Sequence, residues 1–163
     1  MEETTRLEGK KVLIVDDEPD VLDTLEALLP ECEIVSASSF ATAKELLENQ
    51  PVDIAILDIM GVEGFELLKI AKRHHVIAVM LTAHALSPEN VVKSFKEGAA
   101  SYLPKEEMSR IPIFLNDILE AKEKGENFWW RWLQRLDAYF KERFGPGWKA
   151  AEKDFWDKFP FYE

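Results

Sequence analysis

Two patterns of hydrophobic residues alternate along the first three quarters of the chain. Short, continuous apolar runs rich in β-branched residues are typical of strands buried on both faces, as in parallel sheets. Five such runs occur, at Val12–Val15, Glu31–Ala37, Asp53–Leu57, Val76–Leu81 and Ala100–Leu103. Between these runs, apolar residues recur at intervals of three and four, which predicts amphipathic helices.

Local signals indicate where two of these helices begin. Ser87 and Pro88 form a favourable cap and first-position pair, so the fourth helix is expected to start there. Proline is tolerated only in the first turn of a helix, so Pro112 places the fifth helix at about Ser109 to Glu123.

Five strands alternating with five helices predict a doubly wound α/β domain over residues 9–123. Right-handed crossovers would cover both faces of a five-stranded parallel sheet with helices. We expect the flavodoxin-like strand order 2-1-3-4-5. In such sheets ligands bind beyond the carboxyl ends of the strands, at the switch point of the topology.

Residues 125–163 have a different composition. All five Trp and 13 of the 18 aromatic residues lie there. A helix is expected from about Glu126 to Arg143, then a turn at Gly145-Pro146-Gly147, then a short helix from about Trp148 to Lys158. The segment is therefore predicted to be an aromatic-rich helical hairpin.

The first helix of this extension carries an apolar stripe from which Trp130 departs. The stripe consists of Trp129, Trp132, Leu133, Leu136, Phe140 and Phe144, and the second helix presents Phe155, Trp156 and Phe159. Three interpretations are open: a hairpin that packs on itself and on the α/β domain, a self-association surface, or a groove for a partner protein.

Net charge narrows the range of partners. The chain carries a formal charge of −11, all of it in residues 1–124, and the extension is neutral. No basic patch is present, so direct binding of nucleic acid is disfavoured. The neutral extension also disfavours a helix lying on a membrane. No apolar stretch could span a bilayer, so we expect a cytoplasmic location with no membrane partner.

Polar residues that could take part in a reaction lie at the ends of the predicted strands. Asp16 and Asp17 follow the first strand, Asp58 follows the third, Thr82 ends the fourth and Lys105 follows the fifth. A switch point between strands one and three would bring these ends together. Crowded carboxylates repel one another, and a hard cation such as Mg²⁺, which prefers oxygen ligands, relieves the repulsion.

Such a pocket suits phosphoryl transfer. Asp58 would be the nucleophile that forms an aspartyl-phosphate, with Mg²⁺ and Lys105 neutralising charge on the phosphoryl oxygens. Each residue alone has an ordinary explanation: Asp17 or Glu18 could cap the helix that begins near Pro19, and Lys105 could be a surface lysine. The joint pattern, with each residue at the end of its own strand, favours the functional interpretation.

The motifs that carry these residues resemble the signatures of two-component receiver domains, the CheY-like family of response regulators. They are Val15-Asp16-Asp17-Glu18-Pro19, Leu57-Asp58-Ile59-Met60, Leu81-Thr82-Ala83 and Tyr102-Leu103-Pro104-Lys105. The resemblance covers residues 9–123 and leaves 125–163 as an unusual extension.

The resemblance implies a role for each matching residue. Asp58 matches the phosphoacceptor, Asp17 the direct Mg²⁺ ligand and Asp16 its water-mediated companion. Met60 matches the position whose backbone carbonyl binds the metal. Lys105 matches the lysine that contacts the phosphoryl group. Thr82 and Tyr102 match the pair of residues that change position when the domain is phosphorylated.

Two departures from the family pattern stand out. The loop from Asp58 to Gly64 is about two residues shorter than usual and lacks a proline, and Glu106 replaces the proline that usually follows the lysine. A cis bond before Glu106 would cost about 3 kcal/mol, so we expect a trans bond there. His84, two residues after Thr82, lies where the family tunes phosphoryl lifetime, although an exposed loop histidine is an equal alternative.

The leading hypothesis is therefore a response regulator that a sensor histidine kinase phosphorylates on Asp58. The resemblance implies a phosphoacceptor with at most weak autophosphatase activity, not an enzyme. The alternative is a phosphorylation-independent interaction protein or constitutive dimer that uses the aromatic extension. A Mg²⁺ phosphohydrolase is a third possibility, but such enzymes commonly place a second acid two residues after the nucleophile, where this chain has Met60.

Overall fold

The strands form one parallel sheet, as the sequence predicts. The computed structural model describes residues 6–83, 87–126 and 128–158. Strand order is β2-β1-β3-β4-β5, and all four neighbouring pairs are parallel. The strands are β1 (Lys11–Val15), β2 (Glu33–Ala37), β3 (Ile54–Asp58), β4 (Ile77–Thr82) and β5 (Ser101–Pro104).

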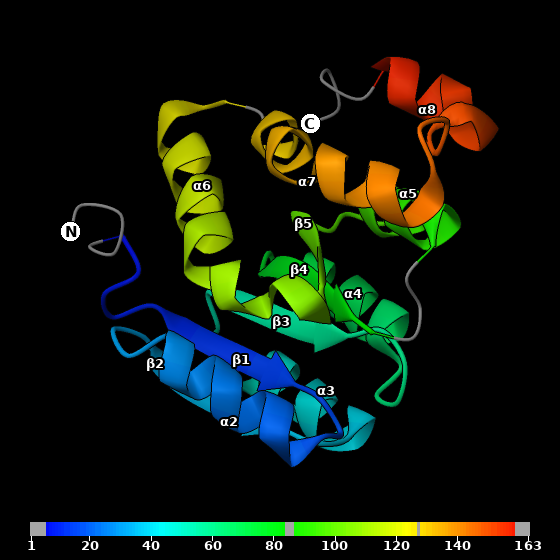
Figure 1. Ribbon diagram of the computed structural model, residues 1–163. Helices are drawn as coiled ribbons and strands as arrows, with labels where there is room; N and C mark the ends of the chain where they lie inside the picture. Colours follow the sequence, from blue (N-terminus) through cyan, green and yellow to red (C-terminus); the bar gives the residue numbers. More distant parts are fainter. Residues whose placement is uncertain (1–5, 84–86, 127, 159–163) are drawn as a thin grey trace.

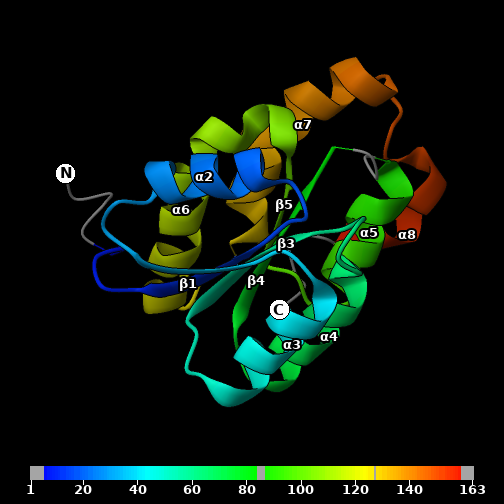
Figure 2. The ribbon, with the colours of Figure 1, turned by 90° about the horizontal axis from the view of Figure 1, so that it is seen from below.

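Helices cover both faces of the sheet and bury its apolar side chains. The flanking helices are α2 (Pro19–Leu28), α3 (Phe40–Asn49), α4 (Gly64–Arg73), α5 (Pro88–Lys96) and α6 (Ile111–Lys124). Helices α2 and α6 lie on one face, and α3, α4 and α5 lie on the other (Figures 1 and 2). Every residue of β3 is buried, which explains why its sequence is a continuous apolar run.

Two helix starts follow the expected chemistry, and a third, that of α2, lacks a side-chain cap. Ser87 caps α5 by accepting a hydrogen bond from Asn90 N at 3.1 Å, and Pro112 lies in the first turn of α6. The ordinary alternative for these acids is that Asp17 or Glu18 caps α2. Glu18 does occupy the cap position, but its side chain makes no capping hydrogen bond, and its backbone N–H donates to Asp16 Oδ1 at 2.9 Å.

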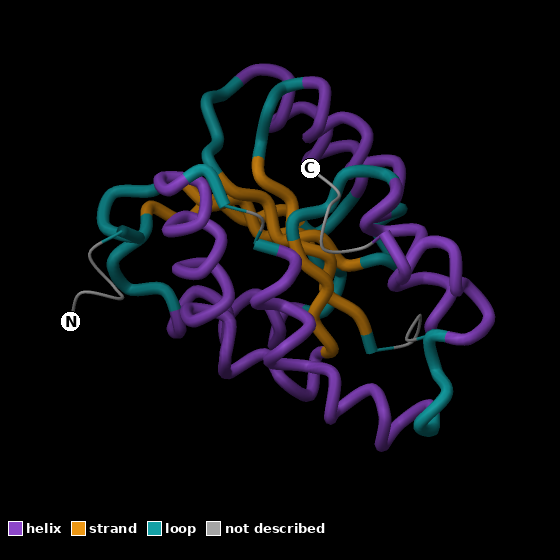
Figure 3. Tube along the Cα trace, turned by 90° about the horizontal axis from the view of Figure 1, so that it is seen from above, coloured by secondary structure: helices purple, strands orange, loops and turns teal. Residues whose placement is uncertain are grey.

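The extension forms the expected helical hairpin. Helix α7 spans Trp129–Phe144, and a 3-10 turn, η2 (Ala150–Glu152), leads into the short helix α8 (Lys153–Lys158). Helix α7 runs beside strand β5, between α5 and α6, and α8 returns beside α5 (Figure 1). The tube view in Figure 3 shows the strands in the middle of the molecule, with helices on both sides of them.

Edge strand β5 explains why α7 docks where it does. An edge strand has backbone carbonyls that no neighbouring strand satisfies. The indole N–H of Trp132 donates to the carbonyl of Tyr102 at 2.6 Å, and that of Trp129 donates to the carbonyl of Ala99 at 3.2 Å. Two tryptophans of α7 thus satisfy backbone acceptors in and beside β5 while burying their rings.

An aromatic cluster extends this contact into the hairpin. The rings of Trp132 and Phe95 lie 4.6 Å apart, and Trp132 also stacks on Trp156 of α8 at 6.4 Å. On the other side, Arg135 pairs with Asp117 of α6 at 2.5 Å. The interpretation that the hairpin packs on itself and on the α/β domain is therefore confirmed. Self-association is untested.

Burial along α7 follows the predicted stripe. Trp129, Trp132, Leu133, Leu136 and Phe140 are buried, whereas Trp130 is 47% exposed. Phe144 is partly buried, and Phe159 lies outside the described residues. Among the described residues, no helix combines the length and the hydrophobicity that crossing a membrane requires.

Candidate functional site

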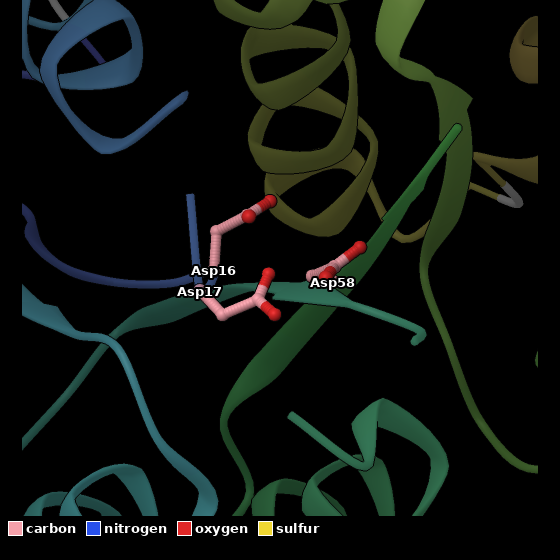
Figure 4. A group of neighbouring side chains, drawn as sticks. All are labelled: Asp16, Asp17 and Asp58. Carbon is pink, nitrogen blue, oxygen red and sulfur yellow. The ribbon is translucent and has the colours of Figure 1, made fainter. Parts of the chain in front are cut away.

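Three aspartates meet at the carboxyl ends of β1 and β3. Asp16 and Asp17 directly follow β1, and Asp58 is the last residue of β3 (Figure 4). Each offers a carboxylate oxygen, and these oxygens lie within 4.8 Å of one another. Asp16 is fully buried and Asp58 is 5% exposed, whereas Asp17 is exposed. The switch point of the sheet thus brings together acids that are 41 and 42 positions apart.

Lys105 supplies the positive charge of the site. Its Nζ lies 2.8 Å from Asp16 Oδ2, 2.9 Å from Glu18 Oε1 and 3.5 Å from Asp58 Oδ1. The lysine follows β5 immediately, so the parallel register carries it to the same end of the sheet as Asp58. Sequence analysis placed Lys105 in the site but missed Glu18 as its partner.

Burial and charge shift the pKa values of this cluster. Burial raises the pKa of Asp58 from 3.8 to about 6, the charge of Asp16 adds to the rise, and Lys105 opposes it. Burial alone would lower the pKa of Lys105, but hydrogen bonds with Asp16 and Glu18 outweigh that effect and raise it. The site therefore holds Asp58 as a carboxyl whose ionisation is costly without added positive charge.

A pH-dependent stability follows for the metal-free protein. The pKa of Asp58 is higher in the folded chain than in the unfolded one. The protonated carboxyl therefore contributes fully to the free energy of unfolding below about pH 4, and this contribution is lost as pH rises through about 6. Asp58→Asn removes this loss, so at about pH 7.5 the variant should be about 1–3 kcal/mol more stable than the wild type. Urea unfolding with a chelator present at about pH 4 and about pH 7.5 measures the difference. A variant less stable than the wild type at the higher pH would contradict this account.

Thr82 and Tyr102 lie on the strands next to Asp58. Thr82 ends β4 and is 1% exposed, and the register pairs Asp58 with Leu81, one residue before it. Tyr102 of β5 is fully buried, with its ring centroid 6.4 Å from that of Phe140 in α7. Burial raises the pKa of Tyr102, so its hydroxyl stays protonated at neutral pH.

The short loop after Asp58 packs tightly against the acids. A Cβ at Gly61 would lie 2.6 Å from Asp17 Oδ2, and a Cβ at Gly64 would lie 2.2 Å from the carbonyl oxygen of Asp58. Position 64 therefore requires glycine because the clash is with backbone, and position 61 favours glycine because its φ is +75°. The carbonyl of Met60 accepts a hydrogen bond from Val62 N at 2.7 Å, which leaves the second lone pair of that oxygen for another partner.

Glu106, the other departure, turns away from the acids toward the extension. Its Oε1 accepts hydrogen bonds from the hydroxyl of Tyr139 and, at 2.9 Å, from Arg143 Nη1. No cis peptide bond occurs among the described residues, so the expected trans bond before Glu106 is confirmed. Lys105 thus contacts the acidic site, and the next residue, Glu106, contacts helix α7. The sequence did not predict this link.

His84 lies in the segment 84–86, outside the described residues.

The donor set of the site fits a hard divalent cation. Carboxylate oxygens from Asp16, Asp17 and Asp58 converge, and Mg²⁺ takes one or two carboxylates together with water and phosphate oxygens. Such an ion would offset the repulsion among the three acids, which Lys105 offsets only in part. The arrangement combines a cation site, a nucleophilic carboxylate and a lysine, as phosphoryl transfer to Asp58 requires.

A doubly wound sheet with an acidic pocket at its switch point is an arrangement that suits phosphoryl chemistry on a carboxylate. The family model of the response regulator receiver domain matches residues 12–112. The chain therefore belongs to the response regulator receiver family of two-component systems. Receiver domains of this family act as phosphoacceptors rather than as enzymes in the usual sense.

Individual relatives agree with this assignment. The chain is 32% identical over 139 residues to the two-component response regulator ORR25 of Oryza sativa subsp. japonica, covering 80% of this chain and 18% of that protein. It is 39% identical over 100 residues to the heme response regulator HssR of Staphylococcus epidermidis, covering 57% of this chain and 43% of that protein. The chain thus spans less than half the length of these relatives.

A solved structure supports the same fold. The CheY-like response regulator receiver domain protein of Methanospirillum hungatei JF-1 matches with a TM-score of 0.65 and 30% identity. The match covers 99% of that chain but 72% of this one. More than a quarter of this chain therefore has no counterpart in that structure.

Proposed function

We propose that this protein is a response regulator that accepts a phosphoryl group on Asp58 from a sensor histidine kinase. The observation that carries the proposal is the convergence of Asp16, Asp17, Asp58 and Lys105 at one end of the sheet. A carboxylate oxygen of Asp58 attacks phosphorus, and the bond between phosphorus and the donor breaks, which leaves an aspartyl-phosphate.

Each residue of the site has a defined task in this proposal. Asp16 and Asp17, with Asp58 and the backbone carbonyl of Met60, would hold Mg²⁺, which supplies positive charge for the phosphoryl oxygens. Lys105 would move its ammonium group from Asp16 and Glu18 toward those oxygens. These assignments rest on the geometry of the acids and on the family pattern.

Thr82 and Tyr102 form the proposed switch. The Thr82 hydroxyl, at the end of the strand next to Asp58, would donate a hydrogen bond to the phosphoryl group. Tyr102 would report this change on the surface formed by α5, β5 and α6. Phosphorylation would change the charge at Asp58, and this local change would shift the equilibrium between two conformations of the surface.

The chain is proposed to consist of a receiver domain, residues 9–123, and an output extension, residues 125–163. Helix α7 of the extension lies on the α5–β5–α6 surface, where its Trp132 bonds the backbone of Tyr102. The extension is thus placed to respond to the switch residues directly.

Binding of Mg²⁺ to this site should stabilise the fold. Added Mg²⁺ should raise the free energy of unfolding by about 2 kcal/mol when its concentration far exceeds the dissociation constant. Asp17→Asn should remove most of this gain because Asp17 is one of the three converging carboxylates. Thermal unfolding with Mg²⁺ and with a chelator measures both effects, and an equal gain in the variant would contradict the assignment of Asp17.

The proposed function is tested by incubating the full chain with phosphoramidate. Intact-mass spectrometry should show one added phosphoryl group with Mg²⁺ present and none with a chelator. Phosphoramidate needs no kinase, so the test does not depend on knowing the cognate one. No uptake under either condition would contradict the proposal.

One observation favours a second candidate, a phosphorylation-independent interaction protein. Helix α7 covers the α5–β5–α6 surface through contacts of its own, including the hydrogen bond from Trp132 to the backbone of Tyr102, and Tyr102 is fully buried beside Phe140. In this case the protein would act through its extension whatever the state of Asp58. This candidate would be favoured if phosphorylation changed neither the hydrogen-exchange rates of the α7 amides nor the oligomeric state.

A further inference from the structure

A cavity links the phosphoacceptor site to the extension. It has a volume of about 110 Å³ and is lined by Thr82, Ala83, Pro104, Lys105, Glu106, Tyr139 and Arg143. Thr82 and Lys105 belong to the site around Asp58, whereas Tyr139 and Arg143 belong to helix α7. The extension and the phosphoacceptor site therefore line the same cavity.

Arg143 is the cation that the extension brings to this cavity. Its Nη1 lies 2.9 Å from Glu106 Oε1 and 3.3 Å from the hydroxyl of Tyr139. Both partners of the ion pair are solvent-accessible, with side-chain exposures of 44% and 64%. An exposed pair of this kind is weak, so Arg143 can exchange Glu106 for a stronger anion at little cost. Glu106 would keep the hydroxyl of Tyr139 as a donor.

We infer that Arg143 is a second cation for the phosphoryl group on Asp58, delivered by the extension. The inference rests on the proposed function and adds a residue from outside the receiver motif to the site. Phosphorylation then strengthens the docking of α7, because the new anion and Arg143 attract each other across the shared cavity.

The charge balance of the site supports this role. A phosphoryl group brings about two negative charges at neutral pH, and Asp16, Asp17 and Glu18, which pairs with Lys105, bring three more. A bound Mg²⁺ ion and Lys105 together supply three positive charges, which leaves about two negative charges to offset. Arginine recognises phosphate oxygens through its planar guanidinium group, and Arg143 already lies at the edge of this cavity.

Beryllofluoride, a stable mimic of the phosphoryl group, tests the inference on the full chain. Titration in Mg²⁺, followed by the tryptophan fluorescence of the extension, gives its apparent affinity. Arg143→Gln should weaken that affinity roughly five- to tenfold, the loss of one partly exposed charge-assisted contact. Lys141→Gln is the matched control, since Lys141 lies in the same turn and pairs with Asp137 on its own helix. Arg143→Lys should retain part of the affinity, because it keeps the positive charge but loses the planar guanidinium group.

The outcomes separate the inference from the proposed function. A selective loss in Arg143→Gln, with its unfolding temperature unchanged when beryllofluoride is absent, supports the inference. Equal affinity in Arg143→Gln and the wild type overturns it and leaves the proposed function intact. An equal loss in Lys141→Gln also overturns it, because the effect would then be one of net charge. If the wild type binds no beryllofluoride, the proposed function itself fails.

Discussion

Asp58→Asn will abolish uptake of a phosphoryl group from phosphoramidate or acetyl phosphate, a fall of at least about a hundredfold in rate. The amide has nearly the same shape as the carboxylate but is no nucleophile, so the reaction loses its attacking atom. The fold should persist, because Asp58 is a crowded acid whose ionisation is costly and Lys105 keeps Asp16 and Glu18 as partners. Intact-mass spectrometry in Mg²⁺ measures the loss.

Asp23→Asn provides the matched control for this result. Asp23 is an exposed acid on α2, and the same change of charge there should leave uptake as in the wild type. Phosphoryl uptake by Asp58→Asn that equals uptake by the control would show that another residue is the acceptor.

The second large effect concerns stability. Trp132→Ala should lower the free energy of unfolding by about 3–5 kcal/mol, the usual cost of removing a buried aromatic ring. Trp132 is 2% exposed, contacts Phe95 and Trp156, and donates a hydrogen bond to the backbone of Tyr102. The substitution leaves a cavity and also leaves that carbonyl of the edge strand without its donor.

Trp130→Ala is the control that shows whether the loss of stability comes from burial of the ring or from the removal of any tryptophan. Trp130 lies on the same helix but is 47% exposed, so its loss should cost no more than about 0.5 kcal/mol. Urea unfolding of both variants gives the comparison. Equal, small effects would show that the extension is not part of the cooperative core.

The predictable part of the fold follows from burial on two faces. Strands β1, β3 and β4 are continuous apolar runs because helices cover both sides of them, and the sequence places each within one residue. Strand β2 has only Ala37 fully buried, and its predicted start, Glu31, is two residues too early. The edge strand β2 therefore carries a weaker apolar signal, whereas the other edge strand, β5, is buried throughout and has helix α7 beside it.

The predictable part of the site consists of residues at strand ends. Asp16, Asp17, Asp58 and Lys105 could be placed together because parallel strands share a carboxyl edge. Glu18 was missed as a partner of Lys105, since its position in a helix cap also has an ordinary explanation. No local pattern connects these two residues, which are 87 positions apart.

The docking of α7 lay beyond sequence analysis for a related reason. An apolar stripe predicts that one face of a helix is buried but does not name the surface that covers it. Glu106 was recognised as a departure from the family, yet its partners Tyr139 and Arg143 are 33 and 37 positions away. A physical hint was present: indole N–H groups on α7 match the free carbonyls of an edge strand.

The central claim, that Asp58 is the phosphoacceptor of this chain, has a direct test. Sodium borohydride reduces an aspartyl-phosphate to an alcohol, so peptide mass spectrometry after phosphoramidate treatment in Mg²⁺ locates the modified residue. This account predicts homoserine at the position of Asp58 and no reduction when a chelator replaces Mg²⁺. Homoserine at a different acid, or no reduced residue in a chain that has taken up a phosphoryl group, would contradict it.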